Sequence, residues 1–281
     1  MRRVAFHTLG CKVNQYETEK IAEGLRMRGC ETVRFSDLAD VYVRNPGAKV
    51  VITGCFAETS PDQAAAIEGV SLVVGNREKD NLVEKVLALL PSSPQPQTTN
   101  HQPPTTNHQP PTPSRPRTRA LLKVQDGCNQ FCSYCAVPLA RSVMSCKPFG
   151  EAVEEAESLA GRGYREIVLT GIRLGLYEDS GNDLVGLLRA LSAVGGIERI
   201  RLSSIELTDI PPGLVELMAE EGTICPHLHI PLQSGDDRTL ARMNRPYTTS
   251  RFREFVRSAR ELIPDIAITT DIMAGFPGET E

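Results

Sequence analysis

The sequence from residue 119 onward alternates short apolar runs with amphipathic segments, and this alternation limits the folds open to the chain. The apolar runs predict strands, and the segments with apolar residues three or four apart predict helices. Strands that alternate with helices form parallel sheets, because parallel crossovers need a connecting helix. The pattern therefore predicts most of a (β/α) barrel, with functional groups at the carboxyl ends of its strands. The expected strands lie at 119–125, 166–171, 197–204, 227–235 and 265–276, and the expected helices at 149–164, 183–194, 211–222 and 250–264.

Residues 1–90 show the same alternation and predict a separate, parallel-sheet α/β domain. Residues 91–118 break the pattern, because they are rich in Pro, Gln, Thr and Asn and contain the direct repeat TTNHQPP. Such a composition predicts a disordered or polyproline-like linker. His101 and His108 recur only because the repeat recurs, so we do not expect them to bind a metal. The expected fold class is α/β, with an N-terminal domain at 1–90, a linker at 91–118 and a partial barrel at 119–281.

Charge and hydropathy exclude some classes of function. The net charge of −4 argues against a strongly basic surface that binds any nucleic acid, although a local basic patch remains open. No apolar run is long enough for a signal peptide or a membrane span, so we expect a cytoplasmic protein. Disulfides are rare in the reducing cytosol, so the eight cysteines predict metal ligands, reactive thiols or buried apolar side chains.

Three of these cysteines follow the first predicted barrel strand with the spacing Cys-x3-Cys-x2-Cys: Cys128, Cys132 and Cys135. Thiolates bind zinc, copper(I) or iron–sulfur clusters. Structural zinc usually takes four ligands in two separated pairs, and the alternative that Cys146 supplies the fourth stays open. A four-iron cluster held by three thiolates leaves one iron free to bind a small molecule. Zinc binding or simple burial of the three thiols is the less favoured alternative.

The segment CNQFCSYC resembles the signature of the radical S-adenosylmethionine superfamily. This resemblance implies a [4Fe–4S] cluster whose open iron binds S-adenosylmethionine and whose electron cleaves it to a 5′-deoxyadenosyl radical. The partial barrel predicted from the strand pattern agrees with the resemblance. Cys128, Cys132 and Cys135 are then both the cluster ligands and the catalytic residues.

The N-terminal domain resembles that of the methylthiotransferase family within this superfamily. FHTLGCKVNQYETE and VVITGCFAE each place a Gly-Cys pair after a strand, at Cys11 and Cys55, and the resemblance implies that both bind a second cluster. TLGCKVNQYET and QDGCNQFCSYC are most similar to the branch that acts on N6-threonylcarbamoyladenosine in tRNA. The implied activity adds a methylthio group to carbon 2 of this base beside the anticodon. The implied partners are the anticodon stem-loop and an electron donor such as flavodoxin or ferredoxin.

The same resemblance implies residues that contact S-adenosylmethionine, all near the carboxyl ends of predicted barrel strands. Tyr134 is expected near the adenine, and Thr170 and Gly171 near the methionine amino group. The remaining expected contacts, to the ribose or the methionine, are Ser203, Ser204, Glu206 and Gln233. Strand-end capping or an ordinary buried hydrogen bond is the alternative role for each of them.

Two features depart from the family pattern. The resemblance implies a second cluster with three cysteines, but here the predicted strand that ends at Val43 runs almost directly into the next one, without the cysteine and the helix expected between them. A parallel crossover needs a dozen or more residues, so either the local topology differs or the segment is absent from this sequence. Cys30 is expected to be an ordinary half-buried thiol in a turn. The chain also ends before the barrel and a C-terminal RNA-binding domain are complete, so we expect an internally deleted, truncated form. Two alternatives remain: another radical enzyme without sulfur insertion, and an inactive fragment that retains one cluster.

Overall fold

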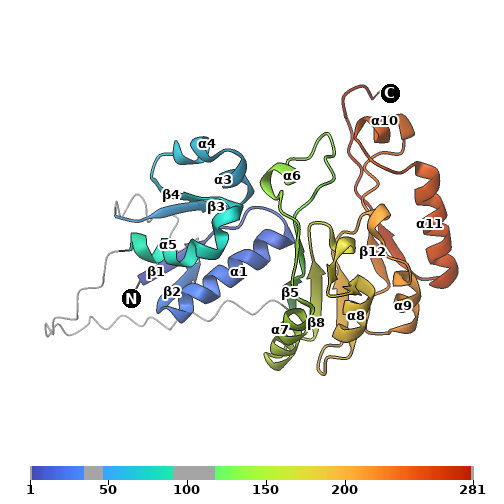
Figure 1. Cartoon of the computed structure of the whole chain (residues 1–281), viewed down its shortest axis with the longest axis horizontal. Coiled ribbons are helices and arrows are strands. Elements are labelled where there is room, and N and C mark those ends of the chain that lie inside the picture. Colours follow the sequence, from blue (N-terminus) through green and yellow to red (C-terminus); the bar gives the residue numbers. More distant parts are fainter. Residues whose placement is uncertain (1, 35–46, 91–117, 280–281) are drawn as a thin grey trace, which may run out of the picture.

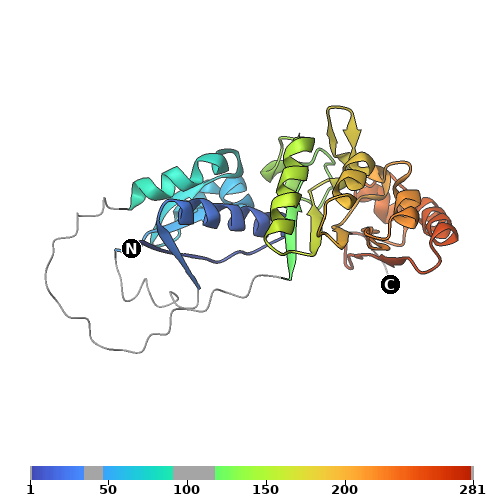
Figure 2. The same ribbon diagram turned by 90° about the horizontal axis from the view of Figure 1, so that it is seen from below.

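The computed structural model describes residues 2–34, 47–90 and 118–279. Figures 1 and 2 show the N-terminal residues, in blue and cyan, beside the green segment with which the second part begins. The predicted strand at 39–43, the junction after Val43 and the linker up to residue 117 lie outside the described residues. No helix among the described residues has both the length and the apolar character needed to cross a bilayer.

Two pairs of parallel strands form the N-terminal part. Strand β1 (Arg2–Phe6) pairs with β2 (Cys30–Arg34), and helix α1 (Lys12–Met27) connects them. Strand β3 (Val50–Thr53) pairs with β4 (Val70–Val74). The parallel α/β architecture expected for this part is confirmed. The remaining elements are α3 (Cys55–Thr59), α4 (Pro61–Ala65), the 3-10 helix η2 (Asn76–Asn81) and α5 (Leu82–Leu89).

Residue Cys30 differs from its expected role. It is the first residue of β2 and is only 5% exposed, so it is a buried strand residue and not a half-buried thiol in a turn. The segment YETEKIAEGLRMRG predicts a helix at 16–29, but helix α1 begins earlier. Gly10 adopts a positive φ of 125°, and the extended Cys11 then forms the N-cap, so the helix starts at Lys12 and not at residue 16.

The second part confirms the predicted alternation. Between residues 118 and 279, five principal strands run parallel: β5 (Arg119–Lys123), β8 (Glu166–Thr170), β11 (Arg199–Leu202), β12 (His227–His229) and β13 (Ala267–Thr269). Parallel bridges at Ile200–Ile224 and Ser204–His229 continue the order from β11 to β12. The helices between these strands include α7 (Phe149–Gly161), α8 (Leu184–Ser192), α9 (Leu214–Glu220) and α11 (Thr249–Leu262). The result is a partial barrel.

Shorter elements complete this part. They are β6 (Gln125–Asp126), α6 (Val137–Ala140), β7 (Ser145–Cys146), η3 (Leu174–Leu176), β9 (Glu178–Asp179), β10 (Asn182–Asp183), η4 (Leu207–Asp209) and α10 (Asp237–Arg242). Strand β12 is shorter than expected, because Pro231 lies two residues after its end and a proline has no N–H for a strand ladder.

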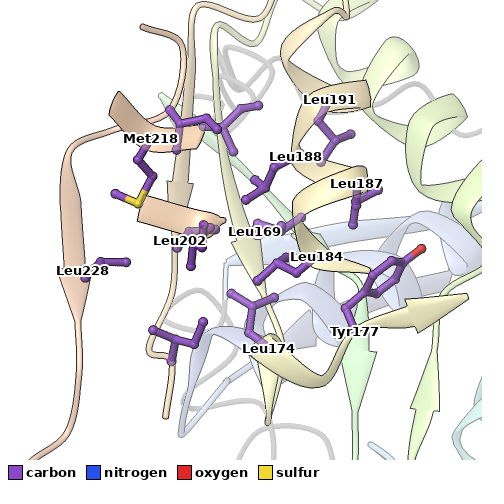
Figure 3. Close-up of a cluster of buried hydrophobic side chains, with 14 of the residues drawn as sticks. Leu169, Leu174, Tyr177, Leu184, Leu187, Leu188, Leu191, Leu202, Met218 and Leu228 are labelled. Carbon is purple, nitrogen blue, oxygen red and sulfur yellow. The ribbon is translucent and has the colours of Figure 1, made fainter. Parts of the chain in front are cut away.

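The main core lies between the barrel strands and their helices. Figure 3 shows the buried leucines of α8 facing side chains from β8 and β11. Leu184, Leu187, Leu188 and Leu191 are fully buried and recur at intervals of three and four residues, which places them on one helix face. The Asp183 carboxylate caps α8 by accepting a hydrogen bond from the Gly186 amide at 2.9 Å. Each buried leucine stabilises the fold by about 1.5–3 kcal/mol relative to an exposed one.

Helix α1 connects the two parts of the molecule. Figure 1 shows it reaching the edge of the green strand β5. The Tyr16 ring packs against Leu121 of β5 and Val168 of β8, and the Tyr16 hydroxyl lies 3.0 Å from a carboxylate oxygen of Glu155 in α7. The N-terminal part therefore packs on the side of the barrel that carries the first barrel strand.

Candidate functional site

A short antiparallel ladder closes the loop that carries the three cysteines. Gln125 and Asp126 of β6 pair with Cys146 and Ser145 of β7, so residues 127–144 leave and return at the carboxyl end of β5. The loop starts with Gly127 at a φ of +84°, and a Cβ atom there would lie 2.1 Å from the Val143 carbonyl oxygen. A glycine is therefore required where the two sides of the loop approach most closely.

The three thiols each receive a hydrogen bond. The Gln130 amide donates to the Cys128 sulfur at 3.4 Å, and the Val137 amide donates to the Cys135 sulfur at 3.4 Å. The Arg245 guanidinium donates to the Cys132 sulfur, also at 3.4 Å. Burial raises the pKa of the Cys128 thiol, and the neighbouring charges of Cys135 and Cys132 raise it further. The three N–H donors act in the opposite direction, because each favours the charged thiolate, which is the form that binds a metal or a cluster.

The segment after α10 holds the loop from the opposite side. The Ser133 amide donates to the Met243 carbonyl at 3.1 Å, and the Asn244 side chain donates to the Phe131 carbonyl at 2.8 Å. Arg245 is only 6% exposed and forms an ion pair with Glu206. Burial opposes the charge of Arg245, but the Glu206 carboxylate outweighs this effect and raises the pKa of the guanidinium. The loop thus lies against a buried, permanently positive side chain.

The donor set fits an iron–sulfur cluster, because its side chains are three soft thiol donors and a four-iron cluster binds each thiolate through a different iron. Hydrogen bonds to the ligand sulfurs, as seen here, are one of the features that set the potential of such clusters.

The Cys146 thiol makes its contacts elsewhere. Its sulfur lies 3.7 Å from the Leu176 carbonyl oxygen and accepts a hydrogen bond from the Glu178 amide at 3.5 Å. Its side chain also packs against the main core. These contacts direct Cys146 towards the η3 segment and give no support to its role as a fourth ligand.

The residues expected to contact S-adenosylmethionine lie around this loop and at the strand ends. Tyr134 is half-buried, and burial together with the nearby Cys132 and Glu206 raises the pKa of its hydroxyl. Thr170 ends β8 and is 1% exposed, and its carbonyl accepts a hydrogen bond from the Val124 amide. A Cβ at Gly171 would lie 3.0 Å from the Gln125 side chain, so a larger residue would press on the buried strand β6.

The other expected contacts come from the third and fourth barrel strands. Ser203 follows β11 and is buried, and its hydroxyl has no hydrogen-bond partner. Ser204 is exposed, whereas Glu206 is bound to Arg245. Gln233 adopts a positive φ of 68°, which is uncommon for a residue with a side chain. The fold therefore brings these residues to one end of the barrel, and the unpaired Ser203 hydroxyl is a buried group that a ligand could satisfy.

Two further cysteines follow strands of the N-terminal part, as the sequence predicts. Cys11 caps α1 after β1 and is exposed, and Cys55 begins α3 after β3. Helix α3 packs against α6, the short helix that begins two residues after Cys135. The Asn76 side chain donates to the Cys55 sulfur at 3.7 Å and to the Ala140 carbonyl at 2.7 Å. The structure thus places the Cys55 segment beside the three-cysteine loop.

A cleft of about 680 Å³, lined by several charged side chains, lies between α1, η2 and the base of the three-cysteine loop. Glu17 of α1 lines this cleft and binds Arg141, Lys123 and Lys79. Burial alone raises the pKa of Glu17, but the hydrogen bonds from Arg141 and the charges of Lys123 and Lys79 outweigh it and lower that pKa to about 2. Glu17 is therefore ionised at neutral pH.

Three arginines of the site, two of them buried and one partly buried, were not identified from the sequence. They are Arg141, Arg245 and Arg173, and Arg173 binds both Asp209 and the Asn129 side chain beside Cys128. None of the motifs quoted above contains any of the three. Their polar partners include residues as far as 127 positions away in the chain, so only the folded structure reveals their roles.

Comparisons with known proteins identify two family models that match this chain. The model of the family described as "Radical SAM superfamily" matches residues 122–281, and that of "Uncharacterized protein family UPF0004" matches residues 3–46. The threonylcarbamoyladenosine tRNA methylthiotransferase MtaB of Bacillus subtilis is 38% identical over 313 residues, covering 100% of this chain and 68% of the relative. The MtaB enzyme of Thermotoga maritima is also 38% identical, over 305 residues, covering 100% of this chain and 70% of the relative.

A second group of relatives acts on a different base. The tRNA-2-methylthio-N(6)-dimethylallyladenosine synthase of Cereibacter sphaeroides is 31% identical over 310 residues, covering 100% of this chain and 70% of the relative. Among solved structures, the cobalamin-dependent S-adenosylmethionine radical enzyme OxsB has a TM-score of 0.54 at 11% identity, covering 96% of this chain and 46% of OxsB. This likeness concerns the fold alone. The chain therefore belongs to the radical SAM superfamily, whose cofactors are a [4Fe–4S] cluster and S-adenosylmethionine, and within it to the family of the tRNA methylthiotransferases.

Proposed function

We propose that this chain is a methylthiotransferase for N6-threonylcarbamoyladenosine in tRNA, replacing the hydrogen on carbon 2 of the base with a methylthio group. The three-thiol loop at the carboxyl end of β5 carries the proposal, because radical chemistry at an unactivated carbon needs such a site. The 38% identity to two enzymes named for this base supports the choice of substrate. The dimethylallyladenosine enzymes are less similar, at 31%.

In this proposal, Cys128, Cys132 and Cys135 bind the catalytic cluster. Bound cluster and S-adenosylmethionine together supply the radical that removes the hydrogen atom. The chain's own contribution is electrostatic: the Gln130 and Val137 amides and the Arg245 guanidinium donate to the three sulfurs. These donors stabilise negative charge on the thiolates and hold the loop in one conformation.

S-adenosylmethionine is proposed to bind across the strand ends that surround this loop. The buried, unpaired Ser203 hydroxyl supports this site, since a buried hydroxyl without a partner costs about 1–3 kcal/mol unless a ligand satisfies it. The positive φ of Gln233 supports it too, because such strain is concentrated at functional sites. The full proposed set is Tyr134, Thr170, Gly171, Ser203, Ser204, Glu206 and Gln233.

The N-terminal thiols Cys11 and Cys55 are proposed to bind a second cluster that provides the sulfur. Their positions after parallel strands and the packing of α3 on α6 support a site that faces the first. The proposed domains are 1–90, a linker at 91–118 and the radical core at 119–281. The proposed N-terminal domain lacks a segment after Val43 that the family pattern contains.

The proposed partners follow from this chemistry. The modified base lies beside the anticodon, so the anticodon stem-loop is the part of tRNA that must reach the three-cysteine loop. The cluster needs one electron for each cleavage of S-adenosylmethionine, so an electron donor such as flavodoxin or ferredoxin is required. Because tRNA and such donors are cytoplasmic, the proposed location is the cytoplasm.

The test is the nucleoside composition of tRNA. A strain that lacks the modification should gain 2-methylthio-N6-threonylcarbamoyladenosine, measured by mass spectrometry, when it expresses this chain. Expression of Cys128→Ala is the negative control. If the wild-type chain produces 5′-deoxyadenosine in vitro but no methylthiolated nucleoside, the second candidate is favoured, a radical enzyme without sulfur insertion. If it produces neither, the inactive fragment is favoured.

A further inference from the structure

The Arg141 side chain connects the two cysteine-bearing parts of the molecule. We propose that Arg141, assisted by Asn76, is a positioning residue that fixes the N-terminal thiols relative to the three-cysteine loop. This inference rests on the proposed function, in which sulfur passes from one site to the other. Transfer between two sites depends on their separation, and a displacement of about 1 Å can lower a rate about a hundredfold.

The guanidinium of Arg141 holds the first turns of α1. One terminal nitrogen, Nη2, donates to the Asn14 side-chain oxygen at 2.8 Å and to Glu17 Oε2 at 2.9 Å. The other, Nη1, donates to Glu17 Oε1 at 2.9 Å. Asn14 and Glu17 lie on the helix that has Cys11 as its N-cap. Because α1 is one continuous helix, the contacts of Arg141 with Asn14 and Glu17 also fix the position of Cys11.

The same residue holds the start of the three-cysteine loop. The Cys128 amide donates to the backbone carbonyl of Arg141 at 3.0 Å. The Arg141 guanidinium also donates to both carboxylate oxygens of Asp126 at 2.8 Å, and Asp126 accepts from the Gly127 amide at 2.8 Å. Both the backbone and the side chain of Arg141 thus hold the residues that lead into Cys128.

A second connection runs through Asn76 of η2. Its side-chain amide donates to the carbonyl of Ala140, the residue before Arg141, at 2.7 Å. It also lies 3.7 Å from the Cys55 sulfur. Arg141 and Asn76 together connect each N-terminal cysteine segment to the end of the three-cysteine loop.

The geometry requires an arginine. The Arg141 side chain is 2% exposed, and its two terminal nitrogens reach Asn14, Glu17 and Asp126 at the same time. A lysine has one nitrogen at the end of a flexible chain, so it can satisfy the charge but cannot hold this planar arrangement. Arg141→Lys is therefore a variant that keeps the charge and loses the geometry.

The first measurement uses the cofactor-free chain and does not depend on activity. A carbodiimide joins lysines to carboxylates that are already in contact, and Lys20 of the N-terminal part lies 2.8 Å from Glu155 of α7. Neither residue contacts Arg141 in the hydrogen bonds described above. Peptide mass spectrometry would measure the yield of this cross-link in wild type, Arg141→Lys and Arg141→Met. Arg165→Lys is the matched control, because Arg165 forms an exposed ion pair with Glu198 within the barrel part.

The second measurement uses the reconstituted enzyme and tRNA. We expect the methylthiolated product per 5′-deoxyadenosine to fall about tenfold in Arg141→Lys, because misplaced sites uncouple cleavage from sulfur transfer. Loss of folded enzyme would instead lower the yields of the methylthiolated nucleoside and of 5′-deoxyadenosine by the same factor. Circular dichroism would check that each variant is folded. If Arg141→Met does not fold, the comparison of Arg141→Lys with wild type tests the proposal on its own.

The outcomes separate this inference from the proposed function. A lower yield of the Lys20–Glu155 cross-link in the Arg141 variants, with the Arg165 control at the wild-type yield, supports the positioning role. An unchanged yield in Arg141→Lys and Arg141→Met overturns it, as does an equal loss in the control. If the wild-type chain makes no methylthiolated product, the proposed function fails, but the cross-link comparison still decides the role of Arg141.

Discussion

Arg141 and Glu17 form a two-pronged ion pair, with both guanidinium terminal nitrogens 2.9 Å from a separate carboxylate oxygen. The two residues belong to different parts of the chain, 124 positions apart. Their side chains are 2% and 12% exposed, so water weakens the pair little. Such a buried pair is sensitive to the loss of either partner, because the remaining partners, Lys123 and Lys79 for Glu17 and Asp126 for Arg141, do not replace the two-pronged contact.

The first prediction concerns acid stability. The pKa of Glu17 is lowered to about 2, so its ionised form favours the folded state. This contribution is complete above the pKa of an unfolded glutamate and is lost as the pH falls from about 4.3 towards 2. Glu17→Gln should therefore destabilise the protein by about 2–4 kcal/mol at pH 7, and the difference should shrink across that window. Urea unfolding of both proteins between pH 7 and pH 3 would measure it.

An exposed glutamate is the control for this experiment. Glu198 pairs with Arg165 on the surface and is 66% exposed, so Glu198→Gln should change stability by less than about 1 kcal/mol at any pH. A difference between wild type and Glu17→Gln that stayed constant from pH 7 to pH 3 would contradict the assignment of the lowered pKa.

The second prediction concerns the start of the three-cysteine loop. Gly127→Ala places a Cβ 2.1 Å from the Val143 carbonyl oxygen at a φ of +84°. The positive φ alone costs about 1–2 kcal/mol for a residue with a side chain, and the clash must move the backbone of the loop. Iron incorporation on anaerobic reconstitution should fall severalfold. Gly150→Ala is the control, because nothing lies within 4 Å of a Cβ there, and it should bind iron like the wild type.

Much of the fold could be predicted because local pattern determines it. The leucines of α8 recur at helical spacing, and all four are buried in the core as that spacing predicts. The three-cysteine loop was found because its ligands lie within eight consecutive residues. Helix starts were less predictable: α1 begins at Lys12 because Gly10 and Cys11 form its cap, and no apolar residue marks that cap.

The charged part of the site could not be predicted, because it depends on contacts between distant segments. Arg245 reaches Cys132 across 113 positions, and Arg141 reaches Asn14 across 127. An arginine in a sequence is usually a solvated surface residue, and nothing local marks these two as buried. The burial of Cys30 was missed for the same reason, since its place at the start of β2 depends on pairing with Arg2 of β1.

The third prediction separates ligand cysteines from the other cysteines. Reconstituted wild-type chain should bind about four irons if only the three-cysteine loop binds a cluster, and about eight if Cys11 and Cys55 support a second one. Cys128→Ala should lower the total by about four. Cys146→Ala should not change it, because the Cys146 sulfur contacts Leu176 and Glu178. Iron and acid-labile sulfide assays would measure all three proteins, and a loss of iron in Cys146→Ala would make Cys146 a ligand after all.

The fourth prediction concerns two serines whose buried hydroxyls both lack a partner, Ser203 after β11 and Ser192 at the end of α8. Removing an unpaired buried hydroxyl relieves a desolvation cost, so each serine-to-alanine variant should match or exceed wild-type stability, by up to about 1 kcal/mol, without cofactors. Only Ser203 lies at the carboxyl end of a barrel strand. Ser203→Ala should therefore weaken the binding of S-adenosylmethionine to the reconstituted protein by about tenfold, the loss of one hydrogen bond, whereas Ser192→Ala should bind it normally.

Thermal unfolding of the cofactor-free variants and equilibrium binding of S-adenosylmethionine would measure the two effects separately. A role in capping or packing predicts that Ser203→Ala loses stability before any cofactor is added, because a capping hydroxyl contributes to the folded state itself. A role in binding predicts the opposite sign, since the cost of the unpaired hydroxyl is recovered only when the ligand is present. Equal affinity of Ser203→Ala and Ser192→Ala for S-adenosylmethionine would remove Ser203 from the binding site.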